Sequence, residues 1–214
     1  MHVLITGANR GIGAALATTY RANGADVTGT ARDGSGDAML DVTDPNSHAA
    51  LARAMDGRAI DLLVCNAGVY LDKGQSLADG YGADMWVQTF AANVTGVFLS
   101  IQSLLPSLRL SDRPKIAIIS SQMASDTHAP GGSYIYRASK AAALNLGRNL
   151  AVDLKPAGIA VGIYHPGWVQ TDMGGPSASI TVDQAAGGLV QRFAHLSMAT
   201  TGCFETWDGQ AHAF

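Results

Sequence analysis

The chain has 214 residues, of which 47% are hydrophobic and 14% are charged, and its formal net charge is −3. This length provides one sizeable domain with a full core. The weak negative charge argues against binding to nucleic acid or an anionic membrane through a basic surface, and favours recognition of a small molecule in a pocket.

Short apolar runs alternate along the chain with longer stretches of helical periodicity. The runs predict strands, in chain order, at residues 2–6, 26–30, 62–65, 115–120, 159–164 and 204–206. The stretches between them predict helices at 11–23, 46–55, 82–109, 134–155 and 181–196, the third divided into two near Asn93. Continuous apolar strands that alternate with helices indicate an α/β protein with a doubly wound parallel sheet of about seven strands and helices on both faces. Such a Rossmann fold binds ligands at the carboxyl ends of its strands.

No linker or repeat divides the sequence, so we expect a single domain over residues 1–214. The sequence MHVLITG leads directly into a strand, and no apolar run approaches the ~20 residues of a membrane span, so we expect neither a leader nor a membrane segment. Cys65 and Cys203 lie far apart and have no metal-ligand spacing. We therefore expect two reduced thiols, no metal site and a cytoplasmic protein.

A glycine-rich turn follows the first predicted strand and opens the first predicted helix. The sequence VLITGANRGIG places Gly7, Gly11 and Gly13 there. Glycine permits a tight turn and a close approach of the backbone, while the helix N-terminus offers unpaired N–H groups to a pyrophosphate. The strand before and the helix after favour dinucleotide binding over the alternative, a turn that merely packs helix against strand.

The end of the second predicted strand, VTGTARDG, is where a dinucleotide-binding protein meets the adenosine ribose. Arg32 stands there and would bind a 2′-phosphate, and Arg10 in the glycine turn would add a second positive charge. These residues favour NADP(H) over NAD(H). Asp33 leaves the alternative open, because a small shift of the loop would bring its carboxylate to a free ribose.

Two further motifs follow predicted strands on the nucleotide side. Asp41 and Val42 in LDVTDP could flank an adenine ring, although Asp44 before a proline shows that the same motif also starts a helix. The sequence CNAG ends the next strand with residues 66–68, whose small, open backbone would let a cofactor pass.

Tyr136 and Lys140 lie four residues apart in YRASK and would share one face of a helix. A nearby ammonium lowers the pKa of a phenol from its usual ~10, so that the phenol can exchange a proton with a carbonyl or an alcohol. Ser120 and Ser121 end the preceding strand and offer a hydroxyl to the substrate oxygen. Asn93 interrupts a helical pattern and could free a carbonyl to hold a water molecule. Each motif alone indicates ordinary structure, but their gathering at one edge of the sheet favours catalysis.

In this combination the motifs resemble the short-chain dehydrogenase/reductase family over nearly the whole chain, and HPGWVQTDMGG with the closing WDG is similar to its C-factor branch. The resemblance implies that Tyr136 is the general acid/base and that Lys140 lowers its pKa and binds the nicotinamide ribose. It further implies that Ser121 positions the carbonyl and that Asn93 anchors a water in a proton relay. The implied cofactor-binding residues are Gly7, Asn9, Arg10, Gly11, Ile12, Gly13, Arg32, Asp41, Val42, Asn66, Ala67, Gly68, Tyr136, Lys140, Pro166, Gly167, Val169 and Thr171.

The resemblance implies an oxidoreductase that transfers a hydride between nicotinamide and a small carbonyl or alcohol substrate, and Arg32 with Arg10 favours NADPH as the cofactor. The alternative is a dinucleotide-binding signalling or regulatory protein of C-factor type with incidental turnover, and the intact Ser/Tyr/Lys set favours the enzyme. A nucleotide-sugar epimerase or dehydratase would need a further substrate domain, for which 214 residues leave no room. The short segment after Thr171 predicts an open substrate pocket.

The predicted helices at 94–109 and 134–155 are apolar on more than one side. The sheet covers one side of such a helix, and a second subunit would cover the other. Members of the family commonly pair these two helices between subunits. We therefore expect a homodimer or a homotetramer, with no nucleic acid or membrane as a partner.

Overall fold

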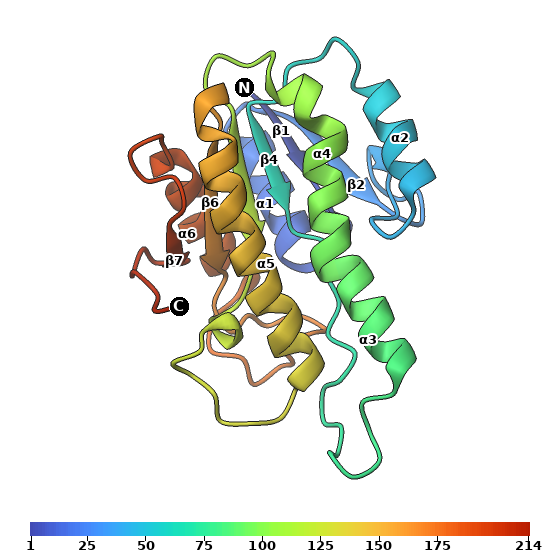
Figure 1. Ribbon diagram of the computed structural model, residues 1–214. Coiled ribbons are helices and arrows are strands. Elements are labelled where there is room, and N and C mark those ends of the chain that lie inside the picture. Colours follow the sequence, from blue (N-terminus) through green and yellow to red (C-terminus); the bar gives the residue numbers. More distant parts are fainter.

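The computed structural model describes residues 1–214 and contains a seven-stranded parallel sheet in the order β3-β2-β1-β4-β5-β6-β7 (Figure 1). The strands are β1 His2–Ile5, β2 Asp26–Ala31, β3 Ala38–Met39, β4 Leu62–Cys65, β5 Lys115–Ile119, β6 Ala160–His165 and β7 Phe204–Thr206. The strand order runs outward from β1 in both directions, so the chain reverses between β1 and β4. This doubly wound topology confirms the predicted fold, and it places a ligand crevice at the carboxyl ends of β1 and β4.

Helices cover both faces of the sheet. They are α1 Gly11–Ala22, α2 Pro45–Ala54, α3 Ala83–Phe90, α4 Gly96–Leu108, α5 Tyr134–Asp153 and α6 Val182–His195. In Figure 1, α4 and α5 cross the near face of the sheet, while α1 and α6 lie behind it. The molecule therefore has three layers, as the alternation of strands and helices predicts.

Alternate side chains along the strands pack into two separate hydrophobic cores, one on each face of the sheet. In β1, Leu4 belongs to the core that α4 and α5 cover, whereas Val3 and Ile5 belong to the core that α1 and α6 cover. All three side chains are fully buried. Because both faces of the sheet are covered, the strands read as continuous apolar runs rather than as alternating ones.

Two elements differ from the sequence prediction. The sequence analysis does not predict β3, because a strand of two residues at the edge of the sheet is too short to show a periodicity. The predicted break near Asn93 is a π-helical turn, Ala91–Thr95, through which α3 passes into α4. A π-helical turn widens the helix without ending it, so the helical path continues from Ala83 to Leu108.

The path from Ala83 to Leu108 also corrects the expectation that no apolar run approaches a membrane span. Its 26 residues are long enough, and its most apolar window is hydrophobic enough, to cross a membrane by length and composition alone. Half of its most apolar window is buried inside the protein, however, and Ile101 and Leu104 of α4 pack in the core against the sheet. The apolar composition thus serves the packing of α4 on the sheet in this structure.

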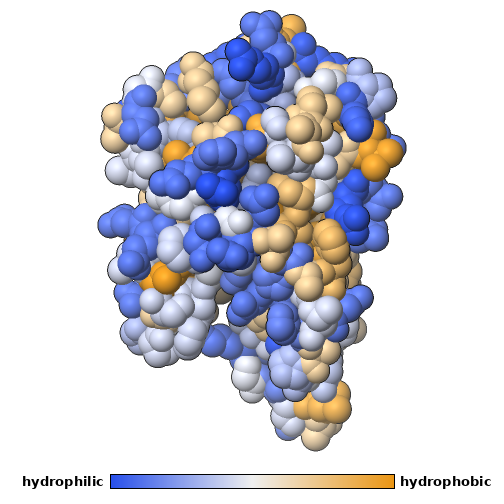
Figure 2. All heavy atoms as spheres, turned by 90° about the vertical axis from the view of Figure 1, so that its left-hand side faces the viewer, coloured by the Kyte–Doolittle hydropathy of each residue, from blue (hydrophilic) through white to orange (hydrophobic).

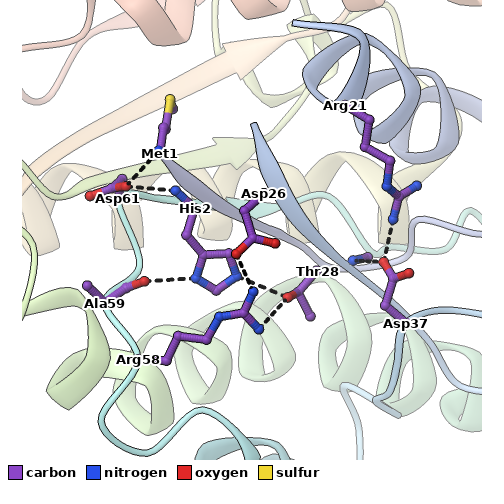
Figure 3. Close-up of polar contacts among 10 residues, drawn as sticks. Met1, His2, Arg21, Asp26, Thr28, Asp37, Arg58, Ala59 and Asp61 are labelled. Carbon is purple, nitrogen blue, oxygen red and sulfur yellow. Dashed lines mark hydrogen bonds and ion pairs between the residues drawn. The ribbon is translucent and has the colours of Figure 1, made fainter. Parts of the chain in front are cut away.

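Polar side chains tie the strands together at their amino ends (Figure 3). The Asp61 carboxylate, just before β4, accepts a hydrogen bond of 2.7 Å from the backbone N–H of His2. The His2 ring lies 3.0 Å from the Thr28 hydroxyl of β2. Arg58 donates to the Asp26 carboxylate at 2.6 Å. These contacts join β1, β2 and the start of β4 at the end of the sheet opposite the ligand crevice.

Candidate active site

The glycine turn after β1 has the geometry of an anion-binding turn. Gly7 and Gly11 adopt left-handed φ values of 66° and 54°, which glycine accepts without strain. A Cβ atom on Gly13 would lie 2.2 Å from the Gly7 carbonyl oxygen, so only glycine fits there. No side chain caps α1, and its first turn holds no acidic residue. The first N–H groups of α1 are therefore available to an anion, and the turn fits the pyrophosphate of a dinucleotide.

The residues after β4 brace this turn. The Asn66 side chain donates hydrogen bonds to the carbonyl oxygens of Thr6 at 3.0 Å and Gly7 at 2.9 Å. Ala67 lies so close to Gly7 that a Cβ on Gly7 would approach its Cα to 3.0 Å. Asn66 and Ala67, both predicted to contact the cofactor, thus hold the glycine turn in place from the neighbouring strand.

Charged residues of both signs lie at the predicted ribose end. The exposed Arg10 pairs with Asp172 at 2.6 Å, so the glycine turn contacts the loop after β6. Asn9 donates to the Asp33 carboxylate at 3.3 Å. Hydrogen bonds from Ser35 lower the pKa of Asp33, which keeps this carboxylate ionised beside the turn. Arg32 is exposed and carries no ion pair.

The predicted adenine residues occupy the turn before α2. The Asp41 carboxylate accepts hydrogen bonds from the backbone N–H of Thr43 at 2.9 Å and from its hydroxyl at 2.7 Å. These bonds lower the pKa of Asp41. Val42 packs against Gly96, where a Cβ would meet the Val42 carbonyl oxygen at 2.7 Å. Asp44 caps α2 through the Asn46 N–H, so the helix-start interpretation of this motif is confirmed.

Asn93 lies in the π-helical turn and is almost completely buried. Its side-chain oxygen accepts from the Val69 N–H at 2.8 Å, and its Nδ2 donates to the Val69 carbonyl at 2.9 Å. The same Nδ2 donates to Ser139 at 3.0 Å, and Ser139 donates to the Tyr136 carbonyl at 2.8 Å. Asn93 thereby connects the segment after β4 to the first turns of α5.

Tyr136 stands in the first turn of α5, with only 7% of its surface exposed. Its ring stacks on that of Tyr70 with centroids 4.2 Å apart and an interplanar angle of 21°. Burial raises the pKa of Tyr136 well above its ordinary value, and a hydrogen bond with Ser121 offsets part of the rise. The direction is opposite to the one that the Tyr136–Lys140 spacing predicts, because burial is the largest influence on this pKa.

Lys140 follows one helical turn later, and its Nζ lies 5.6 Å from the centre of the Tyr136 ring. The ammonium donates a hydrogen bond of 2.9 Å to the Ile119 carbonyl at the end of β5. Burial lowers the pKa of Lys140 to about 8. Ser120 donates to the Lys140 carbonyl at 3.0 Å, whereas the Ser121 hydroxyl accepts from the Met123 N–H at 3.1 Å and lowers the pKa of Tyr136.

The loop after β6 folds back over the glycine turn. Gly167 adopts a φ of 90°, and Val169 forms an isolated parallel bridge with Ile180. The Thr171 hydroxyl accepts a hydrogen bond of 3.1 Å from the Gly174 N–H, while its methyl group would lie 3.4 Å from a Cβ on Gly11. Of the four residues predicted in this loop, Thr171 is the one that the structure brings beside Gly11 at the mouth of α1, while Gly167 lies against Ile180 and Trp207.

Tyr70 and Asp72 also lie next to Tyr136, although no motif in the sequence indicates them. Both lie in the irregular segment 66–82 between β4 and α3. Asp72 has no exposed surface, and its carboxylate accepts a 2.8 Å hydrogen bond from the Ile135 N–H of α5. A single acid in a glycine-rich loop ordinarily signals a surface charge, so no pattern in the sequence indicates its burial.

Known proteins are similar to this chain in sequence and in structure. The sequence profile described as short chain dehydrogenase matches residues 1–180. The C-signal protein of Myxococcus xanthus is 36% identical over 151 residues, which are 70% of this chain and 90% of that protein. The 3-oxoacyl-[acyl-carrier-protein] reductase FabG of Escherichia coli (strain K12) is 33% identical over 204 residues, 88% of this chain and 80% of that protein. The NADPH-bound carbonyl reductase from chicken fatty liver superposes with a TM-score of 0.90 at 29% identity, over 100% of this chain and 98% of that chain.

Proposed function

The chain belongs to the short-chain dehydrogenase/reductase family, in its C-factor-like branch, and is an NAD(P)-dependent oxidoreductase; from this premise we propose that it reduces small carbonyl compounds with NADPH. One observation carries the proposal. Tyr136 and Lys140 of α5 lie at the carboxyl end of β5, where Ser121 follows the strand, and the glycine turn that fits a pyrophosphate lies at the same edge of the sheet. A protein that merely bound a dinucleotide would not need a buried phenol there.

In the proposed reaction Tyr136 is the general acid. Its phenol is protonated at neutral pH and therefore holds a proton for a carbonyl oxygen, which is the direction of reduction. Ser121 holds that oxygen through its hydroxyl, next to the phenol. Asn93 does not touch the substrate in this proposal. Its hydrogen bonds to Val69 and Ser139 hold the segment after β4 against α5 and so support the position of Tyr136.

The nicotinamide supplies the hydride when the cofactor is bound. We assign the glycine turn with Asn9, Arg10 and Ile12 to the pyrophosphate and adjacent ribose, and Asp41 and Val42 to the adenine. Residues 66–68 and the loop with Pro166, Gly167, Val169 and Thr171 would flank the nicotinamide. Lys140 would bind the nicotinamide ribose through its ammonium, for which the pKa of about 8 leaves it mostly charged at pH 7.

The preference for NADP(H) rests on Arg32 and Arg10, and Asp33 opposes it. Arg32 has no ion pair to lose when it binds a 2′-phosphate, whereas Arg10 must leave Asp172. We expect Arg32→Asp to shift the ratio of the NADPH and NADH dissociation constants toward NADH by about tenfold or more. Asp33→Ser should shift the same ratio toward NADPH. If the ratio of the two dissociation constants is unchanged in both variants, Arg32 and Asp33 do not determine the preference between NADPH and NADH.

The reductase function is tested by NADPH oxidation with a panel of aldehydes, ketones and quinones. The wild-type protein should oxidise NADPH with at least one class, and Tyr136→Phe should lose turnover by about 10³-fold or more while it still binds NADPH. Normal turnover in Tyr136→Phe would contradict the assignment of the acid.

The similarity to the C-signal protein favours a second candidate, a dinucleotide-binding signalling protein with incidental turnover. The same panel separates the two. Tight NADPH binding without reduction of any carbonyl would favour the signalling function, since its binding site needs no proton donor.

We also propose that residues 1–214 fold as a single domain. The protein is further proposed to be cytoplasmic and to form a homodimer or a homotetramer. Apolar side chains remain partly exposed on the long helices, such as Phe98 of α4 at 39% and Val152 of α5 at 70%. Polar residues cover much of the face formed by β7 and α6, and apolar ones gather toward the border on the α5 side (Figure 2). Light scattering coupled to size exclusion would give the subunit number, and a monomer would contradict the proposal.

A further inference from the structure

Helix α5, which carries Tyr136, has no cap of its own. The residue at its N-cap position, Ser133, adopts a left-handed φ of 49° and makes no capping hydrogen bond with its side chain. The carboxylate of Asp72, 61 residues earlier in the sequence, caps the N-terminus of α5 instead. It accepts hydrogen bonds from the backbone N–H groups of Ile135 at 2.8 Å and Tyr136 at 3.2 Å. These are the second and third residues of the helix, the pair that a local cap would satisfy.

The charge of Asp72 is compensated by the helix rather than by a cation. The carboxylate has no exposed surface and forms no ion pair with a lysine or arginine. An isolated buried carboxylate is costly, and the two N–H donors together with the positive end of the α5 dipole offset that cost. A local serine or aspartate cap would stabilise the helix without burying a charge from a distant loop, so helix stability alone does not explain Asp72.

The loop that bears Asp72 is fastened to the start of α5 on both sides of this residue. The Tyr70 hydroxyl lies 2.5 Å from the Ser133 hydroxyl, and the Tyr81 hydroxyl accepts from the Ser133 N–H at 3.2 Å. Figure 1 shows this loop between β4 and α3, next to the lower end of α5. The Tyr70 ring also stacks directly on the Tyr136 ring. The backbone and the ring of Tyr136 are thus both held by one segment, residues 70–72.

We propose that Asp72 is a positioning residue that sets the place and the protonation of the Tyr136 phenol, an inference that rests on the proposed reductase function. Through the two N–H groups it fixes the first turn of α5 relative to the end of β4. Through its charge it favours the neutral phenol over the phenolate. The first effect holds the phenol in place, and the second keeps its proton on it until a carbonyl oxygen accepts it.

The charge of Asp72 predicts how the pH dependence of the reductase activity changes when that charge is removed. The groups around Tyr136 are Tyr70, which stacks on its ring, Asp72 at its backbone N–H, Lys140 from α5 and the Ser121 hydroxyl. Burial is the largest cause of the raised pKa of Tyr136, and the negative charge of Asp72 adds to it. Removal of the Asp72 charge lowers the pKa of Tyr136, so the loss of reductase activity at high pH begins at a lower pH.

The test compares Asp72→Ala and Asp72→Asn with the wild-type protein. Asp72→Ala removes both acceptors, and we expect kcat to fall by about 10–100-fold while the NADPH dissociation constant changes less than about twofold. Asp72→Asn keeps one acceptor oxygen without the charge. It should restore most of kcat, and the high-pH limb of its kcat profile should move to lower pH by about half a unit or more. If Asp72→Ala does not fold, the position of the high-pH limb in the kcat profile of Asp72→Asn tests the proposal by itself.

Asp61→Asn is the matched control, because Asp61 also accepts a backbone N–H but lies at the opposite end of the sheet (Figure 3). It should leave kcat and its pH profile unchanged. A folded Asp72→Ala with wild-type kcat, or an Asp72→Asn profile that coincides with that of the wild type, would overturn the proposal. A wild-type protein that reduces no carbonyl would instead overturn the proposed function, and the two failures are therefore distinguishable.

Discussion

The two ends of the sheet use charged residues in opposite ways. At the amino ends, Asp61 and the Arg58–Asp26 pair are hydrogen-bonded and partly exposed, with side-chain exposures of 34%, 41% and 62% (Figure 3). At the carboxyl ends, Asp72 and Lys140 are buried and form no ion pair. Charges near water contribute modestly to stability, whereas buried unpaired charges reduce it and serve chemistry instead. The difference indicates that the buried region around Tyr136 gives up stability for function, unlike the exposed Arg10–Asp172 pair at the same edge.

Lys140→Met is the substitution that should separate stability from function most clearly. We expect turnover to fall by at least about 100-fold, while the free energy of unfolding at pH 7 rises by about 1–3 kcal/mol because a buried charge is removed. Since the folded pKa of about 8 lies below the ordinary lysine value, wild-type stability should rise as the pH increases from about 8 toward ~10.4, and this rise should be absent in the variant. Denaturant unfolding at several pH values measures both effects. Lower stability of the variant at pH 7 would contradict the comparison.

Gly13→Ala tests the packing at the carboxyl end. The new Cβ would lie 2.2 Å from the Gly7 carbonyl and 2.6 Å from Asn66 Nδ2, so the turn must open. We expect a loss of about 1–3 kcal/mol in stability and a marked loss of NADPH affinity. Gly187→Ala in α6 is the control, since a Cβ there meets nothing within 4 Å, and it should stabilise the helix by about 0.5–1 kcal/mol. Equal effects of the two substitutions would show that the turn adapts freely.

Asp61→Asn probes the amino end, where we expect a loss of about 1 kcal/mol in stability at pH 7 with turnover intact. Burial tends to raise the pKa of Asp61, but hydrogen bonds from Ser111 and His2 outweigh it and hold the pKa below its ordinary value. The stability that this carboxylate contributes is therefore present above ~4 and is lost as the pH falls through its folded pKa. Thermal unfolding of both proteins from neutral to acidic pH should show the difference shrinking. A difference that persists in acid would point to packing rather than charge.

Arg58→Met should have the smallest effect. The pair with Asp26 is exposed on both sides, so we expect the melting temperature to fall by about 1–2 °C at low salt. About 1 M NaCl should remove most of the difference, because exposed charges are screened. A larger loss that salt does not change would assign the role of Arg58 to packing of its aliphatic stem or to its contact with Thr28.

The sequence by itself determined the doubly wound sheet, because buried parallel strands must be continuously apolar and the helices between them must be amphipathic. It also identified the glycine turn and the Tyr136–Lys140 pair, since each depends on residue types at a fixed short spacing in one element. Tertiary structure alone decided which groups surround the phenol. Tyr70 and Asp72 reach α5 from a loop 61 or more residues away, and no local pattern encodes such a contact. The direction of the Tyr136 pKa shift was decided in the same way, because burial is a property of the assembled fold and outweighs the nearby ammonium that the spacing reveals.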